Sequence, residues 1–116
     1  MKRENKIALN IRLENNTQSV ENIIDRLFDS GLINQVYNFK VITGRYKGKA
    51  ENTLVIDAIT SKGLVFCVDM VQRLCNVFEQ ECIAAKVDNN DLLIYAANYQ
   101  GEKLKFDKDY FLTIKK

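Results

Sequence analysis

An amphipathic helix near the start of the chain is the feature that most constrains the fold. Its apolar side chains recur three and four positions apart and therefore share one helical face: Val20, Ile23, Ile24, Leu27 and Phe28. Gly31 follows, and glycine ends a helix at low cost because it accepts a left-handed backbone. A helix with one apolar face has to cover another layer, so the segments around it decide the fold.

The segments on either side of this helix alternate in the manner of β-strands with one buried face. Residues 6–13 and 36–42 alternate apolar and polar side chains, and Asn15-Asn16-Thr17 offers a turn and an N-cap between strand and helix. Residues 54–59 are almost continuously apolar, which indicates a central strand. The strands at residues 36–42 and 54–59 are expected to form a hairpin whose loop is longer than two residues.

In the second half of the chain a helix is again followed by strands. A helix is expected from Leu64 to Gln80 with Ser61 as its cap, and its apolar stripe includes the thiols of Cys67 and Cys75 as core groups. The run Asp88-Asn89-Asn90-Asp91 predicts a compact turn. Strands are expected at 82–87, 92–97 and 110–114.

This order predicts an α+β fold, the βαββαβ ferredoxin-like sandwich, with two helices on one face of an antiparallel sheet and a C-terminal β extension. We expect one domain over residues 1–116. The uncovered sheet face would present large side chains, which favours a homo-oligomer: Tyr37 or Asn38, Ile42, Val55 or Ile56, and Tyr95.

Composition narrows the class of protein. A net charge of +2, spread along the chain, makes a long nucleic acid an improbable partner. Three cysteines without a CxxC motif indicate reduced thiols, and the polar N-terminus lacks a signal peptide. No apolar run approaches the ~18 residues of a membrane span. We therefore expect a cytoplasmic protein that does not enter a membrane.

A basic stretch bounded by glycines, Thr43 to Lys49, is the first candidate binding site. Arg45 and Lys47 would supply positive charge to a phosphate, and the glycines would let backbone N–H groups approach it. Tyr46 could stack on a base or a sugar. The alternative interpretation is a solvated hairpin tip with glycines at turn positions.

A second candidate site combines an aromatic ring with amides, as purine-binding pockets do. Phe78 would provide the ring, and Asn90 or Asn98 would read polar edges. The alternative places Phe78 in the core and the amides in turns and caps.

Signals of catalysis are few. The chain contains no histidine and no GxSxG, P-loop or HExxH motif, and Glu79 and Glu81 are typical of a solvated helix end. These observations predict a protein that is not an enzyme and that has no catalytic residues, no metal and no cofactor.

Five residues match a "YxGxxExS … NQE" pattern that is associated with small phage and prophage proteins: Tyr46, Gly48, Glu51, Gln80 and Glu81. The likeness covers about residues 36–96. Asn52-Thr53 stands where the pattern has its serine, and Phe78-Glu79 precedes Gln80 where an asparagine is usual.

The size and the order of elements also resemble the Thoeris anti-defence sponge family. That resemblance implies an oligomer whose interface pockets bind cyclic ADP-ribose isomers, with arginine at the pyrophosphate and an aromatic ring on adenine. Such proteins sequester the ligand and do not cleave it.

We therefore expect a non-enzymatic phage-type protein that sequesters a small phosphate-containing signal nucleotide in the host bacterial cytoplasm. Arg45 and Lys47 would hold phosphates, while Tyr46 or Phe78 would stack on the base. Two alternatives remain open. One is a small protein-binding inhibitor that acts through its open sheet face, and the other is a nucleotide-cleaving phosphodiesterase.

Overall fold

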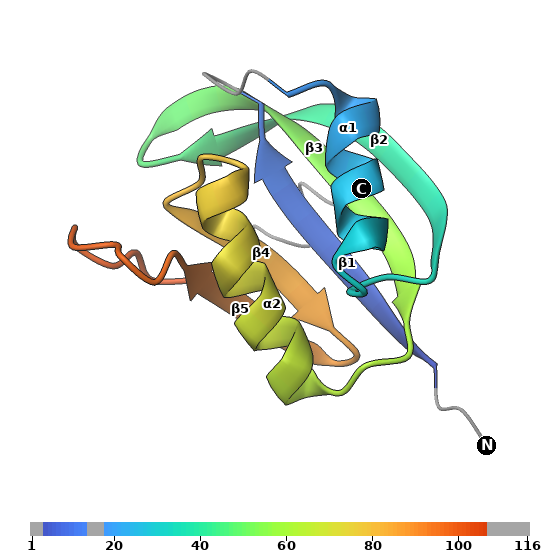
Figure 1. Cartoon of the computed structure of the whole chain (residues 1–116). Coiled ribbons are helices and arrows are strands. Elements are labelled where there is room, and N and C mark those ends of the chain that lie inside the picture. Colours follow the sequence, from blue (N-terminus) through green and yellow to red (C-terminus); the bar gives the residue numbers. More distant parts are fainter. Residues whose placement is uncertain (1–3, 14–17, 107–116) are drawn as a thin grey trace.

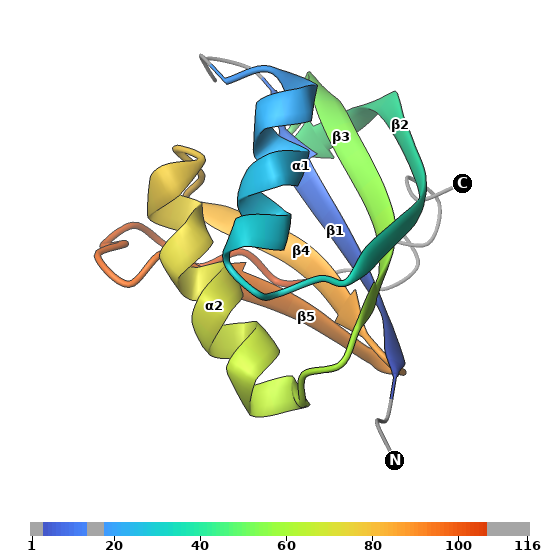
Figure 2. The same ribbon diagram turned by 45° about the vertical axis from the view of Figure 1, so that its right-hand side comes forward.

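A computed structural model describes residues 4–13 and 18–106, which form a sheet with both helices on one of its faces (Figures 1 and 2). The elements, in chain order, are β1 (Asn5–Arg12), α1 (Val20–Asp29), β2 (Gln35–Tyr46), β3 (Lys49–Thr60), α2 (Leu64–Val77), β4 (Cys82–Val87) and β5 (Asn90–Tyr95). The predicted α+β fold class is confirmed.

The sheet has five strands in the order β2-β3-β1-β4-β5, and each neighbouring pair is antiparallel. Because β3 lies between β1 and β2, the first βαβ unit is split in the predicted manner. β5 adds a further strand to the sheet, beside β4. The further strand predicted at 110–114 lies outside the described residues.

The main core lies between the helices and the sheet. Ile7, Leu9 and Ile11 of β1 are fully buried there, and their partners across β3 are Ala58, Ile56 and Leu54. From the helices come Ile23, Leu27 and Val71, together with the buried free thiols of Cys67 and Cys75. The prediction of core thiols is confirmed. No helix within the described ranges is long and apolar enough to cross a membrane.

Helix boundaries differ from the predicted ones at the caps. α1 is capped by Ser19, whose Oγ accepts a hydrogen bond from the amide of Asn22 at 3.1 Å. Residues 15–17, predicted as the cap, lie outside the described ranges. The N-cap of α2 is Gly63 rather than Ser61, and because glycine has no side chain, α2 begins without a side-chain cap hydrogen bond.

The C-terminal end of α2 determines where the next residues point. Glu79 takes a left-handed backbone (φ 57°), and the amide of Gln80 donates to the carbonyl of Cys75 at 2.7 Å. This is the hydrogen-bond pattern of a Schellman motif. It ends the helix at Val77, before the predicted Gln80, and turns Gln80 and Glu81 back toward the sheet.

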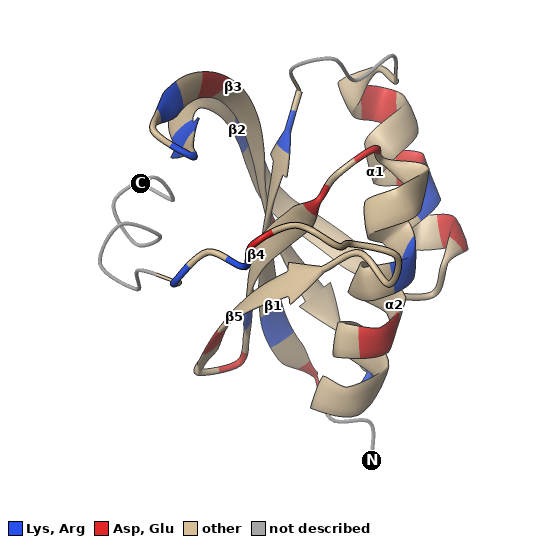
Figure 3. Cartoon of the chain, turned by 90° about the vertical axis from the view of Figure 1, so that its left-hand side faces the viewer, with Lys and Arg blue, Asp and Glu red and all other residues tan. Residues whose placement is uncertain are grey.

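The β2–β3 hairpin is longer than the sequence indicated. Pairing continues to Tyr46 and Lys49, so the turn is only Lys47 (φ 51°) and Gly48 (φ 80°). Two positive φ angles are what a type I′ turn requires. The prediction of a longer loop was therefore wrong, because the polar and glycine residues before the turn remain paired in the strand. Figure 3 shows the hairpin tip curling away from the helices.

The sheet face opposite the helices carries the other half of each strand's side chains. Val55 rather than Ile56 lies on this face, since Ile56 belongs to the main core, and Val55 is itself fully buried. Tyr95 is 8% exposed, whereas Tyr37 on the edge strand is 48% exposed. The predicted homo-oligomer stays a prediction.

Candidate functional site

A cavity of about 330 Å³ lies on the sheet face opposite the helices. Four strands supply its floor, because alternate residues of each strand face away from the main core: Asn10, Thr53, Ala84 and Leu93. The tip of the β2–β3 hairpin, Arg45 to Gly48, lines one side, and the segment Leu104 to Phe106 lines another.

Tyr95 holds the second wall in place. Its hydroxyl donates to the carbonyl of Leu104 at 3.1 Å and also accepts a hydrogen bond from the amide of the same residue. The Tyr95 ring stacks against Tyr99 with the ring centres 4.9 Å apart. The segment after β5 is therefore fixed to the sheet beside the cavity.

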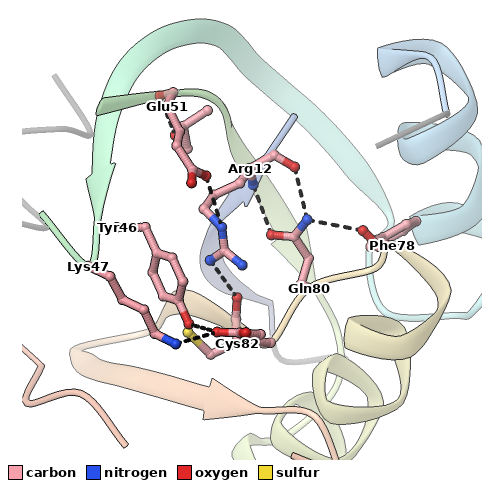
Figure 4. A network of polar contacts seen from close by, with 9 residues as sticks. Arg12, Tyr46, Lys47, Glu51, Phe78, Gln80 and Cys82 are labelled. Atoms are coloured by element: carbon pink, nitrogen blue, oxygen red, sulfur yellow. Dashed lines mark hydrogen bonds and ion pairs between the residues drawn. The ribbon is translucent and has the colours of Figure 1, made fainter. Parts of the chain in front are cut away.

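Arg12, the last residue of β1, is the centre of a polar network at the cavity (Figure 4). Its Nε forms an ion pair with Oε2 of Glu51 at 3.2 Å, and its Nη1 donates to the carbonyl of Cys82 at 3.3 Å. Its guanidinium carbon lies 3.7 Å from the centre of the Tyr46 ring. Arg12 thus connects three segments that are distant in sequence.

Gln80 anchors the backbone of Arg12 (Figure 4). Its side-chain Oε1 accepts from the Arg12 amide at 3.0 Å, and its Nε2 donates to the Arg12 carbonyl at 2.9 Å. The same Nε2 donates to the carbonyl of Phe78 at 3.0 Å. Because Gln80 is only 4% exposed, these bonds are shielded from water and fix the end of β1.

Tyr46 and Glu81 form the outer part of this network. The Tyr46 hydroxyl donates a hydrogen bond to Oε2 of Glu81. The same oxygen forms an ion pair with Nζ of Lys47 at 3.0 Å. These two donors hold the pKa of Glu81 below its ordinary value. Burial, followed by the bond to Glu81, raises the pKa of Tyr46, so its hydroxyl remains protonated at neutral pH. Tyr46 can therefore donate a hydrogen bond but not accept a proton as a base.

The thiol beside the cavity is not an activated nucleophile. Burial raises the pKa of Cys82, which lines the cavity, and the opposing effect of Arg12 is smaller. Burial likewise raises the pKa of Cys75 to about 12. Both groups stay in the thiol form at neutral pH.

Asn10 lies on the cavity floor in the middle of β1 and is 6% exposed. Neither its Oδ1 nor its Nδ2 has a hydrogen-bond partner in the described part of the chain. Buried polar atoms are normally satisfied, so this amide stands out as a group whose partner the described residues do not supply.

The structure brings together only part of the predicted site. Arg45, Tyr46 and Lys47 line the 330 Å³ cavity, and Asn98 lines a neighbouring, more polar cavity of about 460 Å³ that it shares with Lys47. The Phe78 ring is fully buried in the main core and lines neither cavity.

Asn90 lies at the opposite end of the sheet from Arg45. It lines a separate hollow with Asn5, the first residue of β1, and donates to the carbonyl of Val87 at 3.2 Å. β1 runs from that end to Arg12 at the cavity, a span of about 23 Å at ~3.3 Å per residue. Asn90 is therefore the first residue of β5, and its side chain bonds across the β4–β5 turn, away from the cavity.

Sequence reasoning missed Asn10, Arg12 and Thr53 as site residues. The signal was present in the alternation of β1, which places Asn10 and Arg12 on the face opposite Leu9 and Ile11. The "YxGxxExS … NQE" pattern also indicated the site. Four of its five matching residues contact Arg12 or one another beside it: Tyr46, Glu51, Gln80 and Glu81.

Comparison with known proteins gives one informative likeness. No protein-family model and no curated sequence matches the chain. Among solved structures, a phage SAM lyase in complex with S-methyl-5′-thioadenosine is similar, with a TM-score of 0.55 and 19% sequence identity. The match covers 84% of this chain and 93% of the lyase. At this identity the likeness shows a shared fold.

This neighbour corrects the functional prediction. A non-enzymatic sponge was predicted, but the solved structure that shares this fold is an enzyme, a lyase of S-adenosylmethionine (SAM), and this finding contradicts both the sponge and the absence of enzymatic activity. The prediction failed because missing histidine and missing motifs exclude only the chemistry that depends on them. Resemblance to a phage protein and a small nucleoside-like ligand agree with the neighbour, whereas the Thoeris type does not follow from it.

Proposed function

We propose that this protein is a phage-type anti-defence enzyme that binds SAM in the 330 Å³ cavity and cleaves it, with S-methyl-5′-thioadenosine as one product. The observation that carries the proposal is the cavity itself: apolar side chains, a rim of charged groups and an amide without a partner among the described residues, in a fold shared with a phage SAM lyase. Consumption of SAM would deprive host enzymes of their methyl donor.

The size and lining of the cavity suit a nucleoside. Its volume of about 330 Å³ is at the lower end of the ~300–1,000 Å³ typical of small-molecule sites. Ala84, Leu93 and Phe106 offer apolar surface to the faces of a base. Arg45 and Lys105 at the rim supply positive charge for the carboxylate at the methionine end of the substrate.

The proposed reaction needs no general base. The bond between the sulfonium sulfur and Cγ breaks, and its electron pair returns to sulfur, which leaves as a neutral thioether. An oxygen of the substrate's own carboxylate forms a bond to Cγ and closes a five-membered lactone. The net charge of the reactant, one positive, remains on the ammonium group of the lactone, and no proton is transferred.

The surroundings of the cavity favour this change of charge. A sulfonium and a carboxylate are both lost as the bonds exchange, and the apolar part of the cavity lining stabilises the neutral groups relative to the charged ones. The Tyr46 hydroxyl and the Cys82 thiol stay protonated, so neither competes as a nucleophile. The contribution of the protein is to orient the substrate and to exclude water.

The test is incubation of the purified protein with SAM, followed by chromatography and mass spectrometry for S-methyl-5′-thioadenosine. We expect accumulation of that product well above the rate of spontaneous decay. S-adenosylhomocysteine, which has a neutral sulfur and a poorer leaving group, should remain intact. Intact SAM after prolonged incubation would overturn the proposal.

A pair of variants links the activity to the cavity. Arg45→Ala removes a rim cation, whereas Arg73→Ala removes an exposed cation on α2 that pairs with Asp69 at 3.3 Å. We expect about a tenfold or larger loss of kcat/KM for the first variant, the effect of one charge-assisted contact, and no change for the second. Equal activity of both variants would place the reaction elsewhere on the molecule.

A further inference from the structure

The Asn10 amide is a buried polar group of the cavity lining that has no partner among the described residues. It is nine-tenths buried, it lies on the floor, and both of its polar atoms lack a partner in residues 4–13 and 18–106. Its position is fixed, because β1 is the central strand and is paired on both sides.

The neighbours of Asn10 across the sheet cannot satisfy it. The residues opposite are Val55 on β3 and Ala84 on β4, and both have apolar side chains. The nearby Thr53 hydroxyl on the cavity floor donates to the carbonyl of Glu51 at 3.2 Å. An unsatisfied buried amide destabilises the free protein, so a ligand that supplies both partners gains affinity at this point.

From the functional groups of the amide we infer that Asn10 selects adenine as the base of the bound nucleoside. A carboxamide presents one acceptor and one donor side by side. The edge of adenine offers the complementary pair, an exocyclic amino group that donates and an adjacent ring nitrogen that accepts. Two parallel hydrogen bonds between these groups would satisfy Oδ1 and Nδ2 together.

The remainder of the cavity is consistent with this orientation. Apolar side chains line the floor and wall on which the faces of the base would lie: Ala84, Leu93, Leu104 and Phe106. Two of the charged side chains are at the hairpin tip, where the ribose and the methionine end would extend: Arg45 and Lys47. This inference rests on the proposed function only in taking a nucleoside as the ligand, and it deepens that function by naming the group that discriminates the base.

The decisive experiment is a thermodynamic cycle between Asn10 and the 6-amino group of the ligand. Calorimetry would compare S-methyl-5′-thioadenosine with its analogue in which hydrogen replaces the 6-amino group. We expect the wild-type protein to bind the adenine compound about tenfold more tightly, in the range of one bidentate base contact. Asn10→Leu, which has nearly the same size and no polar atoms, should bind the two compounds equally.

Asn22→Leu provides the matched control. Asn22 is exposed on α1, on the other side of the sheet, and its amide bonds to Gln18 at 2.9 Å. This variant should keep the tenfold preference for the 6-amino compound. The same preference in Asn10→Leu would overturn the inference.

A ligand series on the wild-type protein keeps the inference testable if Asn10→Leu does not fold. Removal of the 6-amino group and substitution of carbon for nitrogen at ring position 7 or 1 would be measured separately. We expect loss of affinity on removal of the amino group and at one of the two ring positions. Equal affinity for all analogues, or no binding of S-methyl-5′-thioadenosine at all, would overturn the inference.

The two proposals fail in distinguishable ways. Binding with the expected coupling to Asn10, but without cleavage of SAM, would overturn the enzymatic function and support the adenine contact. Cleavage of SAM with unchanged discrimination in Asn10→Leu would support the function and overturn the adenine contact.

Discussion

The guanidinium carbon of Arg12 lies 3.7 Å from the centre of the Tyr46 ring, although the strands that carry these residues are separated in the sheet by β3. Tyr46 is the last residue of β2, at the tip of a long hairpin that curls away from the helices (Figure 3). The Glu51 carboxylate, on β3, pairs with the same guanidinium at 3.2 Å. One arginine therefore connects the hairpin to the central strand and gives the cavity its rim.

Arg12→Lys should not substitute for the arginine. Lysine keeps a positive charge but lacks the planar group that stacks on Tyr46 and donates to both Glu51 and the Cys82 carbonyl. We expect the free energy of unfolding to fall by about 1–3 kcal/mol, from loss of partly buried charged hydrogen bonds, and SAM cleavage to fall at least tenfold. Urea denaturation and the product assay measure the two effects.

Arg73→Lys on the exposed surface of α2 is the control for Arg12→Lys, and it should leave both the stability and the activity unchanged. Wild-type stability and activity in Arg12→Lys would show that the positive charge alone is sufficient at this position.

Glu81 should make stability depend on acidic pH. Its pKa is lowered in the folded protein from the ordinary value of 4.5, first by the Tyr46 hydroxyl and then by Lys47. A lowered pKa stabilises the folded state above about pH 4.5, and that contribution is lost as the pH falls below 4.5 through the lowered pKa. Glu81 is about half exposed, so we expect at most about 1 kcal/mol.

Urea midpoints at several pH values compare the wild type with Glu81→Gln. We expect the glutamine variant to be less stable near pH 7, and the difference should shrink as the pH falls below 4.5. A constant difference across this range would mean that the charge of Glu81 does not contribute.

Gly44→Ala should destabilise the hairpin through a single clash. A Cβ at this position would lie 2.7 Å from Oγ1 of Thr53 and 3.3 Å from its Cβ, and Thr53 is only 4% exposed and β-branched. We expect a loss of about 1–3 kcal/mol, typical of overpacking. Gly63→Ala, where nothing lies within 4 Å, should change stability by less than about 1 kcal/mol.

Thr53→Ala provides a second test of the same contact. Thr53→Ala removes Oγ1, so Gly44→Ala should lower the free energy of unfolding by less in this variant than in the wild type. Additive effects of the two substitutions would show that the destabilisation arises from the backbone at Gly44.

Glu79→Gly should stabilise the protein, against the usual effect of a glycine substitution. Glu79 is exposed and holds a left-handed backbone (φ 57°) at the end of α2, which costs a residue with a Cβ about 1 kcal/mol and glycine almost nothing. Glu79→Ala removes the charge but keeps the strained Cβ, so it separates the two effects. A thermal melt of both variants should rank glycine above alanine, and equal melting temperatures would contradict the backbone explanation.

Sequence reasoning succeeded where the signal is local. The period of the apolar residues in α1, for example, depends only on which side chains share a face, and that pattern survives any tertiary arrangement. It failed at residues 43–46, where glycine and polar side chains resemble a loop but remain paired with β3. For Phe78 it left a binding role and a core position open, and the ring is fully buried beyond the last turn of α2.

The sequence by itself determined the order of strands and helices, the two buried cysteines of α2, and a basic hairpin tip. Only the tertiary structure decided that Arg12 meets Gln80, 68 residues away, and that Asn10, whose amide has no partner among the described residues, lies on the floor of the same cavity. The physical reason is that strand register and hairpin curvature bring these groups together. Both depend on contacts between distant segments, which no local pattern of residues specifies.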